Sequence, residues 1–389
     1  MNSHLAPLFA IAVALGGCAT AQPGATPAGT TLAESRAAAA PAPTPVKPSI
    51  PTIPQYASAA QALDAELRKA LGGASPEAAL SRRDGYLYGQ DVAALLLYAA
   101  RRNDAELYGK LVPVALKLVQ QNPDDPYTAG FVLWRAKAGQ KPGSSGAAEA
   151  LWMARALWTG AASFKRDEDR KLALAVLDGY AKHAYVLQGV WLARRGFDFS
   201  RRTFANLSTL PAYQPDFLAE AERSGGGKDW RGFAERSYAL LERAATPSHL
   251  LLPVIQPEVG ANYPGAGLEV YAPNGIAPLE DSCLGAEGAA RGLPNLAAGL
   301  LDFAVAHAGK AGGRLSAFYS VEDGLAAGDA PLSAGGYACL SRLASARGHA
   351  EALAVLDPRL LSEMQSAARN RSFATAGSLL LAAYAREAF

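Results

Sequence analysis

The spacing of the residues that could do chemistry rules out several kinds of active site. Gly143-Ser-Ser-Gly146 lacks the Gly-x-Ser-x-Gly spacing of a serine nucleophile, and no Gly-x4-Gly-Lys pattern for phosphates occurs. The histidines do not have the spacing of zinc ligands; they are His4, His183, His249, His307 and His349. We therefore expect no serine-hydrolase triad, no nucleotide site, no metal and no cofactor, which leaves carboxyl and aromatic side chains as candidates.

A cysteine near the N-terminus stands in a setting typical of lipid attachment. Residues 5–17 form an apolar run with the length of a signal-peptide core, too short to span a bilayer as a mature helix. The run ends in Leu-Gly-Gly-Cys18, which resembles the bacterial lipobox, whose cysteine sulfur receives a diacylglycerol. With Ala19 after it, Cys18 predicts an outer-membrane lipoprotein facing the periplasm or the cell surface. The alternative is an ordinary secretory signal that contains a cysteine by chance.

Two regions follow the predicted signal peptide of residues 1–17. Residues 18–55 are rich in Ala and Pro, can bury little apolar surface and are expected to form an extended tether. Residues 56–389 are expected to fold as one domain. In that domain Cys283 and Cys339 are an even pair in an oxidising compartment, for which a disulfide and two separate buried thiols are equally good expectations.

The composition is that of a globular protein with a large core. Of the 389 residues, 50% are hydrophobic and 19% are charged, which is enough apolar material to fold without help from a metal or a disulfide. The 37 Lys and Arg nearly balance the 35 Asp and Glu, so the net charge is only +2. Since no basic run is long enough to follow a phosphate backbone, we expect no nucleic-acid partner.

The elements that must position any site are helices. Beyond residue 56 the apolar spacing is helical in nearly every segment, as in Val92, Leu95 and Leu96. Breakers rich in Gly and Pro recur at short intervals and predict roughly ten to twelve helices joined by short loops. Residues 249–279 contain five prolines, and we expect an irregular or partly β insertion there.

Two architectures suit so many helices, namely an α-solenoid of stacked pairs and a closed toroid of helical hairpins. A solenoid would repeat a block of roughly 34 to 45 residues with the same anchor residues. The sequence has no such recurring block. It therefore predicts an all-α toroid.

Four segments of the predicted domain combine acidic, aromatic and amide side chains. The first is Arg83-Asp-Gly-Tyr-Leu-Tyr-Gly89, which is predicted to open a long helix. The second is Val132-Leu-Trp-Arg135, followed after a Gly/Ser loop by Ala148-Glu-Ala-Leu-Trp152. The third is Asn206-Leu-Ser-Thr209, and the fourth is Gly285-Ala-Glu-Gly-Ala-Ala-Arg291.

In order and spacing these segments resemble the marker segments of glycoside hydrolase family 8, particularly the endoglucanases that accompany bacterial cellulose synthases. The family has Ser-Glu-Gly-Gln-x-Tyr-Gly at the first segment and Asp-Ala-Asp before Leu-Trp at the second. It has Asn-Pro-Ser-Tyr at the third and Tyr-Asp-Ala-x-Arg at the fourth. The resemblance covers about residues 57–389 and implies an (α/α)6 barrel with a substrate cleft across one end.

The resemblance also implies hydrolysis with inversion, which needs a protonated carboxyl as acid and a carboxylate as base, about 6.5 to 9.5 Å apart. Asp84 stands where the family has its acid, one methylene shorter than Glu. The two family aspartates of the second segment map to Ala148 and Ala150. Glu149 lies between them and is expected to point away from their site, since one helical residue is a rotation of about 100°.

The general base of the family maps to Gly288 when Arg291 is held in register. Glu287, one residue earlier, is the candidate for a relocated base. Each carboxyl also has a structural explanation, since Asp84 could cap a helix and Glu287 could belong to a solvated helix start.

Sugar contact is implied for the aromatic side chains Tyr86, Tyr88 and Trp134, because sugar rings stack their C–H faces on such rings. Asn206 and Arg291 keep the family's residue types, and with Glu149 they complete the predicted substrate-binding residues. The alternative is that the aromatic rings pack the core, which is the stronger expectation for Trp152 on an Ala- and Leu-rich helix.

Three functions fit these features. The first is a tethered lipoprotein that binds a β-linked glucan or related exopolysaccharide during its synthesis or export, with slow hydrolysis or none. The second is a divergent endo-β-glucanase that uses Asp84 as acid and Glu287 as base. The third is a helical scaffold that recruits proteins of a polysaccharide secretion complex.

Overall fold

The computed structural model describes residues 53–73, 75–187, 190–223, 228–257, 267–310 and 313–386. The predicted signal peptide and Cys18 lie outside the described residues, as does the predicted tether up to residue 52. Within the described ranges, no helix is both long enough and apolar enough to cross a membrane.

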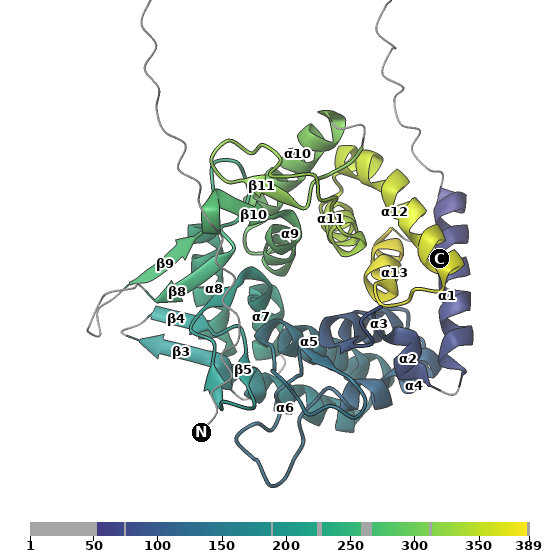
Figure 1. The fold of residues 1–389 in the computed structure, drawn as a ribbon, viewed down its shortest axis with the longest axis vertical. Coiled ribbons are helices and arrows are strands. Elements are labelled where there is room, and N and C mark those ends of the chain that lie inside the picture. The colour runs from purple at the N-terminus through teal and green to yellow at the C-terminus, as the bar shows by residue number, and fades with distance from the viewer. Residues whose placement is uncertain are drawn as a thin grey trace, which may run out of the picture. The chain divides into compact units, whose positions relative to one another are not determined.

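Helices build the domain and close into a ring of two layers (Figure 1). The inner layer is formed by α3, α5, α7, α9, α11 and α13, and the outer layer by α1, α4, α6, α8, α10 and α12. This is the (α/α)6 barrel that the resemblance implied. The helices of the described residues are α1 (Ile53–Leu71), α2 (Pro76–Leu80), α3 (Gly89–Arg101), α4 (Ala105–Leu116), α5 (Ala147–Phe164), α6 (Asp167–His183), α7 (Pro215–Arg223), α8 (Trp230–Ala244), α9 (Leu279–Gly288), α10 (Pro294–Lys310), α11 (Ala334–Arg347), α12 (Ala350–Asn370) and α13 (Ala376–Ala385).

The inner helices α3 and α13 can pack side by side because their central residues are apolar, and many of them small, on every face. In α3 all residues from Val92 to Ala100 are buried, as expected for a helix that is apolar all round. The backbones of α13 and α3 approach closely, since a Cβ on Gly377 would come within 2.4 Å of the Leu95 nitrogen. Glycine at this position therefore sets the spacing of the two helices.

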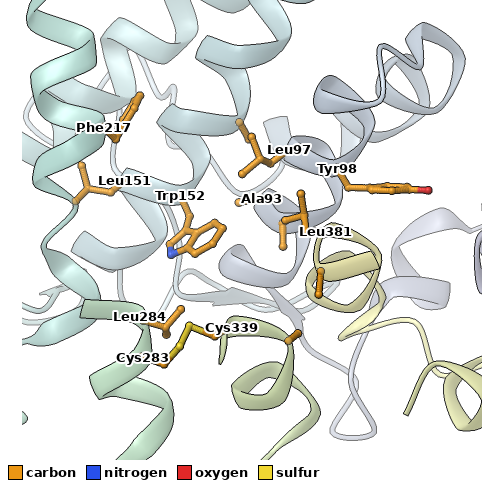
Figure 2. Close-up of a cluster of buried hydrophobic side chains, with 14 of the residues drawn as sticks. Ala93, Leu97, Tyr98, Leu151, Trp152, Phe217, Cys283, Leu284, Cys339 and Leu381 are labelled. Atoms are coloured by element: carbon orange, nitrogen blue, oxygen red, sulfur yellow. A yellow bond between two sulfur atoms is a disulfide. The ribbon is translucent and has the colours of Figure 1, made fainter. Parts of the chain in front are cut away.

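A disulfide links two inner helices inside the ring. Cys283 of α9 and Cys339 of α11 are bonded, and both are fully buried. Figure 2 shows this bond near Trp152 of α5, whose indole points into the same interior. Of the two expectations for the cysteine pair, the disulfide is the one found, and Trp152 packs in the core.

Short antiparallel strands lie in the loops between the helices. They form the pairs β1–β2, β3–β4, β5–β6 and β10–β11 and the three-stranded sheet β7–β8–β9. Their bounds are β1 (Leu87–Tyr88), β2 (Arg135–Ala136), β3 (Ala184–Leu187), β4 (Val190–Ala193), β5 (Phe197–Asp198), β6 (Thr203–Phe204), β7 (Ser208–Thr209), β8 (Val254–Pro257), β9 (Leu268–Tyr271), β10 (Ile276–Pro278) and β11 (Phe318–Ser320), with 3-10 turns η1 (Leu210–Ala212) and η2 (Pro273–Gly275).

The structure agrees with one of two predictions about loops, that for residues 249–279, and differs from the other, that for the first marker segment. The partly β insertion predicted at residues 249–279 contains β8, β9 and β10 in its described part. The first marker segment, predicted to open a helix at Arg83, instead forms a turn and β1, and α3 begins only at Gly89. The reason is local, since Gly85 has a φ of 78° that no α-helix tolerates.

We predict that the disulfide contributes to stability. It closes a loop of 56 residues, for which chain-entropy arguments give about 4 kcal/mol. The Cys283→Ser/Cys339→Ser variant should lose that much free energy of unfolding in urea melts. Dithiothreitol should destabilise the wild type similarly and leave the double variant unchanged. Equal melts for the two proteins without reductant would contradict the prediction.

Candidate functional site

A cleft of three adjoining pockets lies where inner helices begin. The central pocket has a volume of about 650 Å³ and is lined by the first turns of α3, α5 and α9. Its residues include Gln90, Glu149, Arg195, Asp198, Arg201 and Asp281. Because three inner helices present their N-terminal ends here, the cleft crosses one end of the barrel.

A flanking pocket lies on each side of the central one. The lysine pocket, of about 670 Å³, shares Trp134 and Ser144 with the central pocket. The proline pocket, of about 440 Å³, shares Thr209 and Asp281 with it. The shared residues show that the three pockets adjoin one another. The lysine pocket is lined by Glu77, Tyr86, Lys117, Arg135, Lys137 and Lys141 among others, and the proline pocket by Pro253, Pro273, Pro278 and Phe318 among others.

Glu149 places a buried carboxyl in the central pocket. It stands in the first turn of α5, and its Oε2 folds back over the N-cap residue Gly146, where a Cβ would come within 1.7 Å of that oxygen. Burial raises the pKa of Glu149 to about 7; the Arg195 and Arg82 guanidiniums oppose this rise and the Asp91 carboxylate adds to it. The Glu149 carboxyl therefore titrates near neutral pH and is protonated in part of the molecules there.

The expectation that Glu149 points away from the site is wrong. It assumed that the site is fixed by the positions of Ala148 and Ala150, whereas Ala148 and Glu149 both line the pocket and Ala150 is fully buried. At the third position of a helix, a glutamate commonly reaches back toward the N-cap. This reach brings the carboxyl to the end of the barrel.

Asp281 supplies a second carboxyl to the same pocket. It lies in the first turn of α9. Burial raises its pKa to about 6, with the neighbouring Glu280 charge adding to the effect and Arg195 opposing it. Glu280 itself is turned toward α11, where it accepts a hydrogen bond of 2.6 Å from Ser333 Oγ. Among the described residues, the Asp281 carboxyl has no hydrogen-bond or ion-pair partner, so it is free to meet a ligand.

The positive charge of Arg195 influences the pKa values of both Glu149 and Asp281. Its charge lowers the pKa of Glu149 and that of Asp281, in each case against the effect of burial. The backbone around it also holds the start of α5, because Ala147 N donates to Arg195 O at 3.0 Å. Arg195 N donates in turn to Leu207 O at 2.7 Å.

A neutral histidine supports the loop that leads into α5. His183 Nδ1 lies 2.9 Å from Arg194 O, and its Nε2 lies 3.3 Å from Ser145 Oγ. Burial lowers the pKa of His183 to about 4, so the ring is uncharged at neutral pH. His183 is thus a positioning residue for the segment that ends at Gly146. Among the described residues, no cluster of His, Cys, Asp and Glu could hold a metal ion.

Asp84, the predicted acid, lies outside the central pocket and keeps its charge. Its Oδ2 accepts from Tyr88 OH at 2.7 Å and its Oδ1 from Tyr86 N at 3.0 Å. These hydrogen bonds, with the nearby Arg135, hold the pKa of Asp84 below its ordinary value. Asp84 forms a turn and caps no helix. Its catalytic role stays a prediction, and its surroundings favour an anion over a proton donor.

Glu287, the predicted base, is part of a buried ion pair between α9 and α11. Its two oxygens accept from Arg342 Nε and Nη2, both at 2.7 Å. Burial works against the charge, but Arg342, Arg155 and Arg101 together hold the pKa of Glu287 below its ordinary value. Breaking such a pair by removing one partner costs about 3–5 kcal/mol. Glu287 does not line the cleft pockets, and its contacts explain it as a structural residue.

The predicted aromatic residues lie together beside the cleft. Trp134 is 39% exposed and lines both the central and the lysine pocket. Tyr86 lines the lysine pocket, and Arg135 lies 4.1 Å above its ring. Tyr88 meets Trp134 edge to face at a centroid distance of 5.8 Å and supports it from outside the pockets.

Two further predicted binding residues are not brought to the cleft. Asn206 is exposed and lies outside the three pockets, although its neighbour Ala205 lines the central one. Arg291 ties the end of α9 to α7, since its backbone N donates to Asp216 Oδ2 at 2.8 Å and its Nη2 to Asp216 O at 3.1 Å. Their roles in binding stay predictions.

Sequence reasoning missed Asp281 and Arg195 as site residues. Holding Arg291 in register placed the base at Gly288, seven residues beyond Asp281. Asp281 supplies the aspartate of the family pattern, although Ser282 then stands in place of its alanine and Leu284 in place of its arginine, and it lies in the first turn of a helix that begins directly after Pro278. Arg195 had no such signal, since it lies in a connection between strands.

Solved structures share this fold over most of the chain. An α-amylase from Clostridium perfringens superposes with a TM-score of 0.65 at 15% identity, covering 84% of this chain and 97% of that one. The endo-β-1,4-glucanase CMCax from Acetobacter xylinum gives 0.58 at 15%, covering 82% and 99%. A cold-adapted family 8 xylanase gives 0.56 at 15%, covering 85% and 91%. The fold is thus that of glycoside hydrolase family 8, as the sequence resemblance implied.

Comparison by sequence gives no further assignment. No family model matches the chain, and no curated protein does. At 15% identity the structural likeness concerns the fold, so the chemistry has to be argued from the residues of this chain.

We predict that Gly146 keeps the Glu149 carboxyl buried. Gly146→Ala should push that carboxyl toward water, because the new Cβ takes the place of Oε2. In a carbon-13 NMR titration of labelled glutamates, the wild type should show one carboxyl with a midpoint of about 7, and Glu149→Gln should remove that signal. Gly146→Ala should move the midpoint to lower pH.

Gly143→Ala is the matched control, because a Cβ there meets nothing within 4 Å. It should leave the midpoint of Glu149 unchanged. A wild-type titration without any glutamate above pH 6 would refute the burial argument.

Proposed function

We propose that this chain hydrolyses a polysaccharide bound along the cleft, with Glu149 as general acid and Asp281 as general base. The observation that supports this most is the presence of two carboxyls with raised pKa values in one open pocket, each in the first turn of an inner helix. Glycoside hydrolysis needs such a pair in opposite protonation states.

The proposed reaction is a single displacement with inversion. Glu149 donates its proton to the glycosidic oxygen as the bond from that oxygen to the anomeric carbon breaks. Asp281 takes a proton from a water molecule as the water oxygen bonds to the anomeric carbon from the opposite face. Arg195 faces both carboxyls and stabilises the carboxylate that Glu149 becomes.

A polymer is the substrate that suits the shape of the cleft. Three adjoining pockets give room for several sugar units in a row, and Trp134 offers a partly exposed ring at the junction of two pockets. The names of the similar structures include a β-1,4-glucanase and a xylanase. We therefore propose a β-linked glucan or related exopolysaccharide as substrate, met outside the cytoplasm by a lipoprotein anchored through Cys18.

The test is release of reducing ends from carboxymethyl cellulose and from mixed-linkage β-glucan. Glu149→Gln and Asp281→Asn should each lower kcat by about 10²–10⁴-fold, the range of general acid–base catalysis. Glu106→Gln, on the exposed face of α4, is the control and should keep full activity. Loss of activity in Asp84→Asn together with full activity in Glu149→Gln would refute the assignment of the acid.

The pH dependence of kcat/KM should be a narrow bell. Activity requires Asp281 without its proton and Glu149 with its proton. The rate should therefore fall as the pH drops below about 6 and again as it rises above about 7. A rate that stays level from pH 5 to pH 9 would contradict this pair.

A second candidate function is binding of the same polymer without hydrolysis. It is favoured by the residues at the family's catalytic positions, since Asp84 holds its charge and Ala148 and Ala150 carry no carboxyl. Retention of the wild type on insoluble glucan without release of reducing ends would support it. A scaffold for secretion proteins would give neither retention nor release.

A further inference from the structure

We propose that the lysine pocket binds a carboxylate-bearing sugar, so that the polysaccharide in the cleft is rich in uronic acid. This inference rests on the proposed function, because it assigns the chemical class of the polymer in the same cleft. It concerns the lysine pocket, which Trp134 lines on one side. The two proposed catalytic residues, Glu149 and Asp281, line the central pocket and not this one.

The charges that line the lysine pocket are strongly unbalanced. Lys117, Arg135, Lys137 and Lys141 line it, against the single acid Glu77. Glu77 is already paired with Lys117, and Arg135 lies 3.7 Å from the Asp84 carboxylate, so the excess charge rests on Lys137 and Lys141. The chain as a whole carries a net charge of only +2, so this excess is local and does not reflect a basic protein.

Two of these lysines, Lys137 and Lys141, are not paired with an acidic side chain among the described residues. Lys141 has no hydrogen-bond or ion-pair partner among the described residues. Lys137 donates only to a backbone carbonyl, that of Asp84, at 3.3 Å, and its ammonium lies 5.2 Å from the Tyr86 ring centre. A carbonyl oxygen does not neutralise an ammonium, so a ligand carboxylate would find both cations available.

The wall that carries the two lysines is held in place. Tyr86 OH donates to Gln140 Oε1 at 2.7 Å, which fastens the segment between Lys137 and Lys141 to the residues before β1. The pairing of β1 with β2 fixes the same region. The lysines therefore stand on an organised wall, which lowers the entropy lost when a ligand binds.

Aromatic rings and cations alternate here in a manner suited to an acidic sugar. Arg135 lies 4.1 Å from the Tyr86 ring centre and 4.6 Å from that of Trp134. The rings can meet the C–H face of a sugar while the cations meet its carboxylate. By contrast, the only charged side chain that lines the proline pocket, among the described residues, is Asp281. The cleft is thus cationic at one end only, and the acidic unit is assigned to that end.

The experiment compares two oligosaccharides that differ only in charge, the β-1,4-linked hexamer of glucuronic acid and cellohexaose. Binding is measured by calorimetry at low salt in the Glu149→Gln background, which prevents turnover. The acidic hexamer should bind about tenfold more tightly than cellohexaose, and salt should reduce the difference. Lys137→Gln/Lys141→Gln should weaken the acidic hexamer roughly three- to tenfold and leave cellohexaose unchanged.

Lys69→Gln/Lys171→Gln, on the exposed faces of α1 and α6, is the matched control and should change neither affinity. Equal affinities for the two hexamers, with cellulose derivatives still cleaved by the wild type, would overturn the inference and leave the proposed function standing. If neither hexamer binds and no cellulose derivative is cleaved, both the inference and the proposed function are wrong. Tighter binding of a sulfated cellohexaose than of the acidic hexamer would overturn the assignment to uronic acid.

Discussion

The close packing of small residues between inner helices is the constraint on which the cleft depends. Because α3, α5 and α13 are mostly apolar and carry many Ala and Gly residues among their buried positions, they can approach closely within the ring. A closed ring aligns helix starts at one end, and the first turns of α3, α5 and α9 meet there around one pocket. The site is a consequence of the way the ring closes.

The same packing raises the pKa values of two acids, Glu149 and Asp281. An exposed Glu or Asp at a helix start is ordinarily an anion, since the helix dipole and free N–H groups favour its charge. In this ring the first turns of α5 and α9 are surrounded by other elements, and desolvation outweighs those effects, so both Glu149 and Asp281 gain affinity for protons. The fold thus raises the pKa values of two acids in the first turns of helices toward neutral pH.

Much of the fold could be predicted from the sequence, whereas the site could be predicted only in part. The helical spacing and the marker segments indicated the barrel. Trp134 and Tyr86, which were predicted to contact sugar, line pockets of the cleft, and the contact itself stays a prediction. The catalytic pair was harder, because the choice between Asp281 and Gly288 turns on a register that no single residue fixes. Arg291 suggested the register, but its hydrogen bonds to Asp216 explain it as a link between α9 and α7. Glu149 was expected to point away from the site on helical rotation alone, which ignores how a side chain in the first turn folds back.

The contact between Gly146 and the Glu149 carboxyl limits how this chain can diverge. Residue 146 has an extended backbone with a φ of −136°, so any amino acid could adopt its conformation, and only the oxygen above it demands glycine. A relative that carries a larger residue at this position must have moved or lost the carboxyl three residues later. Among homologues, the presence of glycine at position 146 should therefore vary together with the presence of an acid at position 149, although glycine itself takes no part in the chemistry.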